Sequence, residues 1–183
     1  MNTKTLLVID MQKDLCHNLR RKNKVANMLP PLLQAIDLFS SAKMPIFYIR
    51  FSLKKDDEQF DRFGDKYCIE GTEGAELIPE LFPLRGPVIT KQKHSAFYET
   101  NLHDLLTEAG VHEVYLAGLQ THICIMTTAA DASFRGYKAI AIKDCVLSTT
   151  ETNKEDALFW IKKYVGDVKS LNEVASEISN EAT

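Results

Sequence analysis

The chain has 183 residues, of which 45% are hydrophobic, and this is enough for one domain that buries a core without disulfide or metal support. Its formal net charge is -3, with acidic and basic residues interspersed, so nothing indicates a nucleic-acid surface or a polybasic membrane arm. No apolar run approaches the roughly 20 residues that span a bilayer. We therefore expect a single domain over residues 1–183 whose partner is a small molecule, not a nucleic acid or a membrane.

The cysteines give no sign of a disulfide framework. They lie far apart in the sequence and contain no C-x-x-C pair. We also expect no secretory leader. Such a pattern is typical of a reducing compartment, so we expect a cytoplasmic protein. The four residues concerned are Cys16, Cys68, Cys124 and Cys145.

The first half of the chain begins with a continuous apolar run at residues 5–9, which predicts a parallel strand buried on both faces and followed by Asp10. A loop is expected next, and then a helix over residues 25–42, with Pro30 and Pro31 in its first turn, where proline is best tolerated. A second strand at residues 45–51 leads into a loosely structured loop. That loop is expected over residues 53–65, and a short helix near residues 75–81.

The second half continues the alternation of strand and helix. A helix that begins soon after Gly118 carries Cys124 in its first turn and is stopped by Gly136. The tail after Ser176 is expected to be loosely structured. The other expected elements are strands at residues 88–90, 113–117, 138–144 and 167–169 and helices at about residues 101–109 and 153–164.

This order of elements predicts an α/β fold: a doubly wound, Rossmann-like parallel β-sheet of about six strands with helices on both faces. Sheets of this kind bind ligands at the carboxyl ends of the strands, where the strand order reverses. A nucleotide-binding module is a competing hypothesis for such a fold. Neither G-x-G-x-x-G at the first strand–helix junction nor G-x-x-x-x-G-K-[ST] occurs, however, so the phosphate cradle is missing.

Three reactive side chains follow the expected strands. Asp10 comes after the first strand, Lys91 after the third and Cys124 after the fourth, so all three are expected to meet at one edge of the sheet. A helix N-terminus and a nearby lysine both favour a thiolate over a thiol. We therefore expect a depressed pKa at Cys124 and alkylation of this cysteine before the other three.

Five local sequences, in this order, resemble those of the isochorismatase-like cysteine hydrolases, a family that includes nicotinamidases and N-carbamoylsarcosine amidase. The resemblance covers nearly the whole chain, and its strength lies in the order of the five segments. They are Val8-Ile9-Asp10-Met11-Gln12, Gly71-Thr72-Glu73-Gly74-Ala75-Glu76-Leu77, Lys91-Gln92-Lys93-His94-Ser95-Ala96-Phe97, Gly118-Leu119-Gln120-Thr121-His122-Ile123-Cys124 and Arg135-Gly136-Tyr137.

The resemblance implies a catalytic triad of Asp10, Lys91 and Cys124. It also implies a non-proline cis peptide bond between Leu119 and Gln120, and an oxyanion hole formed by the backbone N–H groups of Gln120 and Cys124. The implied reaction is hydrolysis of a C–N bond in a small amide, ureido or carbamoyl compound through an acyl-thioester intermediate, without a cofactor. Family members are commonly dimers or larger, so a homodimer or higher homo-oligomer is expected.

Departures from the family pattern narrow the reaction. Nicotinamidases hold a metal with an Asp and histidines just after the second strand, where this chain reads Arg50-Phe51-Ser52 and has no histidine, so no metal is expected. Isochorismatase itself cleaves a vinyl ether and has a small residue in place of Cys124, which makes that activity the weaker alternative.

Two questions stay open at this stage. A catalytically silent member that acts as an interaction protein is a further alternative, which the complete triad argues against. For the substrate pocket we expect Gln12, Arg50 and Phe97. Arg50, Lys54 or Arg62 is a candidate for holding an anionic end of the substrate, although surface lysines and arginines are common on loops.

Overall fold

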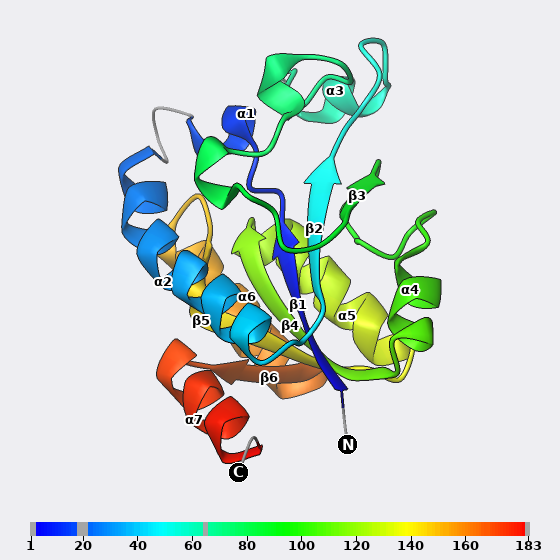
Figure 1. The fold of residues 1–183 in the computed structure, drawn as a ribbon. Coiled ribbons are helices and arrows are strands. Elements are labelled where there is room, and N and C mark those ends of the chain that lie inside the picture. Colours follow the sequence, from blue (N-terminus) through cyan, green and yellow to red (C-terminus); the bar gives the residue numbers. More distant parts are fainter. Residues whose placement is uncertain (1–2, 18–21, 64–65, 182–183) are drawn as a thin grey trace.

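The computed structural model describes residues 3–17, 22–63 and 66–181, and the expected alternation of strands and helices is present (Figure 1). Arg62 and Phe63 are described in their backbone alone. The strands are β1 (Thr3–Ile9), β2 (Ile46–Phe51), β3 (Val88–Lys91), β4 (Val111–Leu119), β5 (Lys138–Leu147) and β6 (Gly166–Lys169). The helices are α1 (Lys13–Cys16), α2 (Lys22–Ser41), α3 (Gln59–Phe63), α4 (Leu102–Glu108), α5 (Met126–Phe134), α6 (Glu151–Tyr164) and α7 (Leu171–Glu181), with short helical turns η1 (Glu73–Ala75), η2 (Pro79–Leu81) and η3 (Thr121–Ile125).

The six strands form one parallel sheet in the order β3-β2-β1-β4-β5-β6, which confirms the predicted fold class. The chain builds outward from β1 to β3 and then returns to the centre to place β4 on the other side of β1. Ile9 at the end of β1 is paired with Gly118 near the end of β4. The strand order therefore reverses between these two strands, and the loops that follow them face the crevice formed there.

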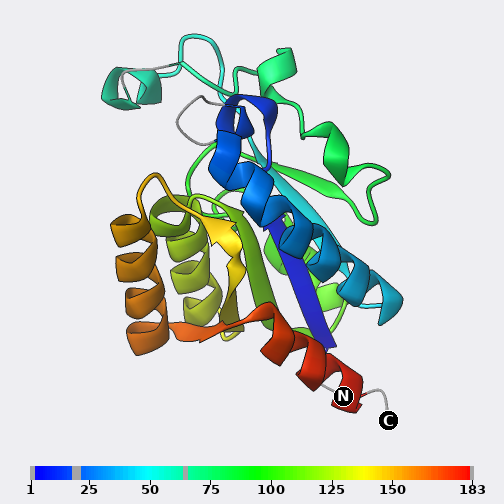
Figure 2. The same cartoon turned by 90° about the vertical axis from the view of Figure 1, so that its left-hand side faces the viewer.

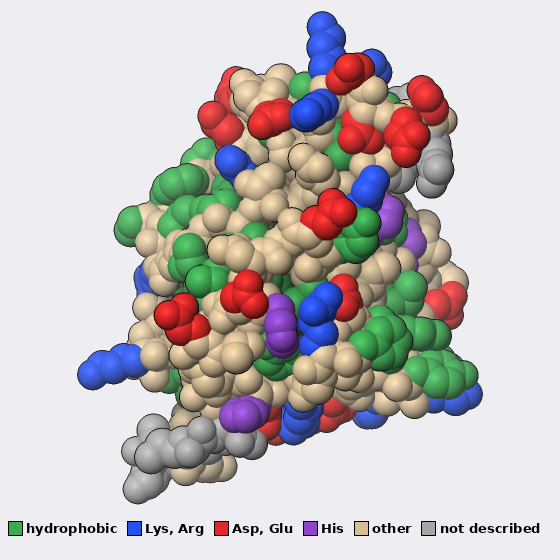
Figure 3. Space-filling view, turned by 90° about the vertical axis from the view of Figure 1, so that its right-hand side faces the viewer, with side chains coloured by type: hydrophobic (Ala, Val, Ile, Leu, Met, Phe, Trp, Pro, Cys, Tyr) green, Lys and Arg blue, Asp and Glu red, His purple; other side chains and the backbone are tan. Residues whose placement is uncertain are grey.

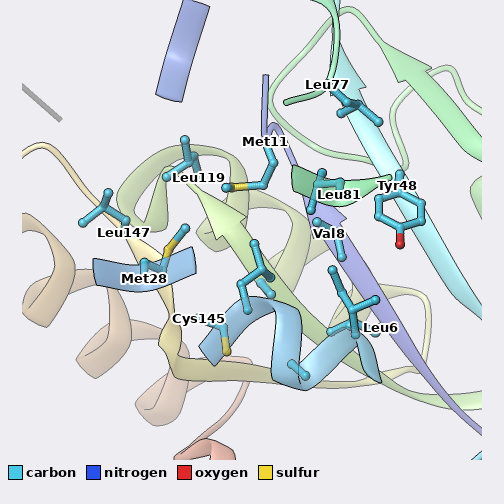
Figure 4. Packing of buried hydrophobic residues seen from close by; sticks show 14 of the residues in the cluster. Leu6, Val8, Met11, Met28, Tyr48, Leu77, Leu81, Leu119, Cys145 and Leu147 are labelled. Carbon is cyan, nitrogen blue, oxygen red and sulfur yellow. The ribbon is translucent and has the colours of Figure 1, made fainter. Parts of the chain in front are cut away.

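Helices cover both faces of the sheet (Figures 1 and 2). Because side chains alternate along a strand, Leu6 and Val8 pack on one side with α2 and α7, whereas Leu7 and Ile9 pack on the other with α4, α5 and α6. Figure 4 shows the first of these cores, where Met28 of α2 lies among side chains of β1, β4 and β5. Two buried cores thus hold the central strands rigidly in register.

Helix α2 differs from the prediction in where it begins. It begins at Lys22, so Pro30 and Pro31 lie inside the helix and not in its first turn. A proline inside a helix removes a backbone donor and leaves a carbonyl one turn earlier without its usual partner. Burial of Met28, Leu32, Ile36 and Phe39 against the sheet outweighs this local cost.

Two segments are more ordered than expected, and one predicted helix is less regular. The segment predicted as a loose loop contains α3, and the short helix predicted near residues 75–81 is divided into η1 and η2. The tail forms α7, which buries Leu171, Val174 and Ile178 on one side. These residues recur at helical spacing, so the apolar stripe, and not the polar composition, decides the structure of the tail.

At Gly118, β4 lies close against the backbone of β1. Its φ is +112°, and a Cβ atom at this position would lie 2.0 Å from the carbonyl oxygen of Ile9. Glycine alone accepts such a backbone conformation without strain, and here it also admits the neighbouring strand.

Replacement of Gly118 with Ala is expected to lower the free energy of unfolding by about 1–3 kcal/mol, because the methyl group strikes backbone that cannot move aside. Urea unfolding followed by circular dichroism measures the change. Gly136→Ala is the matched control, since Gly136 also has a positive φ of +88° but no atom within 4 Å of the added Cβ. Equal losses in the two variants would show that backbone strain, and not the contact with Ile9, matters.

The surface carries mixed charge. On the face shown in Figure 3, Lys and Arg side chains are interspersed with Asp and Glu. Among the helices that the structure describes, none has the length and apolar character needed to cross a membrane.

Candidate active site

The structure brings Asp10, Lys91 and Cys124 together at the carboxyl edge of the sheet. Lys91 Nζ lies 2.9 Å from Asp10 Oδ2 and 3.3 Å from Cys124 Sγ. Lys91 ends β3, two strands away from β1, so its long side chain must cross the end of β2 to reach the other two residues. It passes the ring of Phe51, whose centroid lies 5.0 Å from Nζ.

Local backbone structure places each of these side chains. Asp10 has a positive φ of 56°, and its N–H donates to the carbonyl of Ile49 on β2, which holds the residue at the end of its strand. Cys124 lies in η3, which runs directly into α5. The peptide bond between Leu119 and Gln120 is cis, and the carbonyl of Gln120 accepts from the N–H of Ile123.

The electrostatics of the site centre on a buried ion pair. The side chains of Lys91 and Asp10 are 0% and 2% exposed. Burial by itself lowers the pKa of Lys91, but the neighbouring Asp10 carboxylate and Cys124 outweigh it, so the pKa of Lys91 lies above its ordinary value. The lysine therefore remains an ammonium group beside the sulfur.

The pKa of Cys124 corrects the prediction. Burial, and then the charge of Asp10, raise the pKa of this thiol to about 12, while Lys91 acts in the opposite direction without prevailing. Cys124 is only 8% exposed, so loss of water weighs more than the lysine and the helix end. The resting site thus contains a thiol beside a carboxylate, and it needs a base to make the sulfur a nucleophile.

A cavity of about 100 Å³ opens onto the sulfur. Its polar groups include Asp10, Gln120 and Cys124, and its other walls are largely apolar or aromatic. Asp10 Oδ1 and Gln120 Oε1 are buried and have no hydrogen-bond partner within the described part of the chain. The remaining lining residues are Leu15, Phe51, Tyr67, His94 and Ile123.

His94 is a cavity residue that the sequence reasoning missed. Its Nδ1 lies 4.0 Å from Cys124 Sγ, and its ring stacks on Phe51 with 6.5 Å between centroids. Burial, and then the charge of Lys91, lower the pKa of His94, so the imidazole is uncharged at neutral pH. Its position three residues after Lys91 in the same motif was the available signal.

The three residues predicted to line the substrate pocket are not among those that line this cavity. Gln12 is fully buried and clamps backbone: its Nε2 donates to the carbonyls of Phe51 and Ala75, and its Oε1 accepts from the Phe51 N–H. Phe97 is 3% exposed and stacks on Tyr137, away from the cavity.

Arg50 points to the other side of β2 from Phe51. Its Nε donates to Thr90 Oγ1, and the residue lines a second, wider cavity of about 620 Å³ that also contains Lys13. Lys54 is exposed, and the side chain of Arg62 lies outside the described residues. Arg50 is therefore separated from the sulfur by the strand itself.

The other cysteines add no reactive group to the cavity, and neither does the segment after β2. Cys16, Cys68 and Cys145 are free and buried, and Cys145 Sγ donates to the carbonyl of Pro31 under α2. Ser52 directly follows β2, at the position compared above with the metal site of nicotinamidases, and it is buried. Within residues 3–17, 22–63 and 66–181, no group of three or more His, Cys, Asp or Glu side chains is placed to hold a metal ion.

Comparison with known proteins places this geometry in a family. Residues 4–173 match the isochorismatase domain family. The chain is 31% identical over 160 residues to the isochorismatase family protein YaaI of Bacillus subtilis, covering 85% of this chain and 86% of that protein. It is 30% identical over 165 residues to nicotinamidase 3 of Arabidopsis thaliana, covering 84% and 77% of the two chains.

A solved structure agrees with these sequence relatives. The crystal structure of N-carbamoylsarcosine amidase from Thermoplasma acidophilum superposes with a TM-score of 0.83 and 30% identity, covering 93% of this chain and 97% of that one. The matching domain, the relatives and the shared fold lead to one conclusion: this chain belongs to the isochorismatase family of hydrolases.

Proposed function

We propose that the chain is a cysteine-dependent hydrolase that cleaves a C–N bond of a small amide, ureido or carbamoyl compound. The contact of Lys91 with both Asp10 and Cys124 at the base of a cavity carries this proposal. A nucleophile, a base and a fixed positive charge are the groups that acyl transfer needs at one place. The names of two relatives, a nicotinamidase and an N-carbamoylsarcosine amidase, agree with an amide substrate.

Asp10 is the proposed general base and acid. When the substrate carbonyl lies over the sulfur, the Cys124 thiol gives its proton to Asp10 and the sulfur forms a bond to the carbonyl carbon. The C–N bond then breaks, and Asp10 returns the proton to the departing amine or ammonia. An acyl-thioester on Cys124 remains.

Water completes the cycle. Asp10, again a carboxylate, takes a proton from water while the water oxygen attacks the thioester carbon. The C–S bond then breaks, the acyl group leaves as a carboxylic acid, and Asp10 returns the proton to the Cys124 sulfur. In both steps the negative charge on the carbonyl oxygen is held by the backbone N–H groups of Gln120 and Cys124, which are the proposed oxyanion hole. Lys91 keeps its charge throughout and stabilises the sulfur whenever that atom is anionic.

The proposal also includes a cytoplasmic location and a homodimer or larger assembly. Four free, buried thiols agree with a reducing compartment. The assembly rests on the resemblance to the family, and size-exclusion chromatography with light scattering measures it.

A screen of small amides and ureas for ammonia release tests the function. Cys124→Ala is expected to lower kcat by roughly 10⁴-fold or more against any substrate found, because the covalent route is removed. Brief acid quenching and intact-mass measurement should find an acyl adduct on the wild type, and peptide mapping should place it on Cys124. Cys145→Ala is the matched control, since that thiol packs beneath α2. Full activity in Cys124→Ala would refute the covalent mechanism.

A further inference from the structure

The charged groups beside the sulfur are Lys91 and Asp10. Lys91 is fully buried behind Asp10 and Cys124 and is paired with Asp10 Oδ2, so its positive charge is already matched. The other carboxylate oxygen, Oδ1, has no hydrogen-bond partner among the described residues, and neither has Oε1 of Gln120. Both residues line the cavity, so two acceptors without donors lie in its wall.

Substrate N–H groups satisfy such acceptors, whereas a carboxylate, which has acceptors only, does not. His94 is the remaining polar group near the sulfur, and it is uncharged at neutral pH because burial and Lys91 lower its pKa. Leu15, Phe51 and Ile123 supply apolar surface. A second negative charge in this space would be repelled by Asp10, and the described lining residues include no Lys or Arg to offset it.

Two described cations that follow or end the neighbouring strands, Lys13 and Arg50, are engaged elsewhere. Arg50 lies on the opposite side of β2 and donates to Thr90. Lys13 lies 3.0 Å from carboxylate oxygens of both Glu73 and Glu76. Of the lining residues that the structure describes, none is Lys or Arg.

We infer that this cavity selects uncharged amides over anionic ones, and that Gln120 and His94 are the residues that determine this specificity. The inference rests on the proposed amide hydrolysis and adds the substrate class. Gln120 lines the cavity with an acceptor that lacks a donor, and His94 forms an uncharged part of the wall beside the sulfur.

A matched pair of substrates tests the selection. Isocaproamide and succinamate carry the same primary amide on the same two-carbon spacer and differ in whether the far end is an isopropyl group or a carboxylate. Wild-type kcat/KM is expected to favour isocaproamide by roughly tenfold or more, since like charges placed together are strongly disfavoured. If neither compound is turned over, their inhibition constants against an amide that is turned over give the same ratio.

Variants of His94 and Gln120 test whether these residues determine the preference for the uncharged amide. His94→Arg places a permanent cation in the cavity and should shift the ratio toward succinamate by roughly tenfold, whereas the uncharged His94→Gln should not. Gln120→Lys provides a second cation if His94→Arg fails to fold. Any change in the reactivity of Cys124 affects both substrates and cancels in the ratio. Arg50→Gln should leave the ratio unchanged.

Two results would overturn the inference. One is a wild-type preference for succinamate, and its loss in Arg50→Gln or Arg62→Gln would show which arginine holds the anion. The other is an unchanged ratio in both cation-bearing variants. Absence of any Cys124-dependent amide hydrolysis would instead refute the proposed function, so the two failures are distinguishable.

Discussion

An Asp10→Asn variant is expected to lose amide hydrolysis while its Cys124 is alkylated faster than that of the wild type. The loss should be about 10²–10⁴-fold in kcat, because asparagine cannot accept the thiol proton or return it to the amine. The alkylation rate should increase, because the charge of Asp10 helps to raise the pKa of Cys124. Asparagine removes that charge while Lys91 remains.

Iodoacetamide labelling across a pH series, followed by peptide mapping, measures the second effect. Thiolate is the reactive form, so the labelling rate of wild-type Cys124 should increase about tenfold per pH unit well below its pKa. The Asp10→Asn curve should lie at lower pH. Asp37→Asn, which removes an exposed carboxylate paired with Arg85, is the control. Slower labelling of Asp10→Asn would mean that Asp10 does not oppose ionisation of the thiol.

Lys91→Met should have the largest effect on stability. The lysine and Asp10 are both buried, so removal of the cation leaves a carboxylate in the interior without its partner, at a cost of about 3–5 kcal/mol in the free energy of unfolding. Alkylation of Cys124 should become slower, since Lys91 is the group that lowers the pKa of this thiol. Hydrolysis should be lost as well. Urea unfolding and the labelling series measure the two effects.

Two further variants make this result specific. The double variant Asp10→Asn/Lys91→Met should recover part of the lost stability, because no charge is then left unpaired. Lys138→Met breaks an ion pair with Glu113 whose lysine is half-exposed and whose nitrogen–oxygen distance is 3.5 Å, and Glu113 keeps a hydrogen bond from Tyr115, so the stability should change by less than about 1 kcal/mol. If Lys91→Met and Lys138→Met were equally stable, the Lys91–Asp10 pair would not be the buried interaction described above.

The meeting of Asp10, Lys91 and Cys124 was accessible from the sequence because it depends on few assumptions. Once three apolar runs are assigned as parallel strands of one sheet, the residues that follow them must share its carboxyl edge. The resemblance of five segments to one family then implied that these residues form a catalytic triad. Neither step requires knowledge of how side chains pack.

The walls of the cavity were not accessible in the same way. Arg50 and Phe51 are neighbours in β2, so they point to opposite faces, and only the three-dimensional arrangement shows that Phe51 faces the sulfur. Gln12 finds its partners 39 and 63 positions away in the sequence. The pKa of Cys124 depends on how deeply the thiol is buried, which a motif does not reveal.

The clamp formed by Gln12 has a consequence for engineering the enzyme. One side chain bonds to the backbone at both Phe51 and Ala75, so the wall of the cavity and a surface turn share a single support. Substitutions at positions 51 and 75 should therefore be epistatic, with combined effects that the single variants do not predict. Leu15 and Ile123 lie on separate elements, α1 and η3, and are better first targets for a library that varies substrate range.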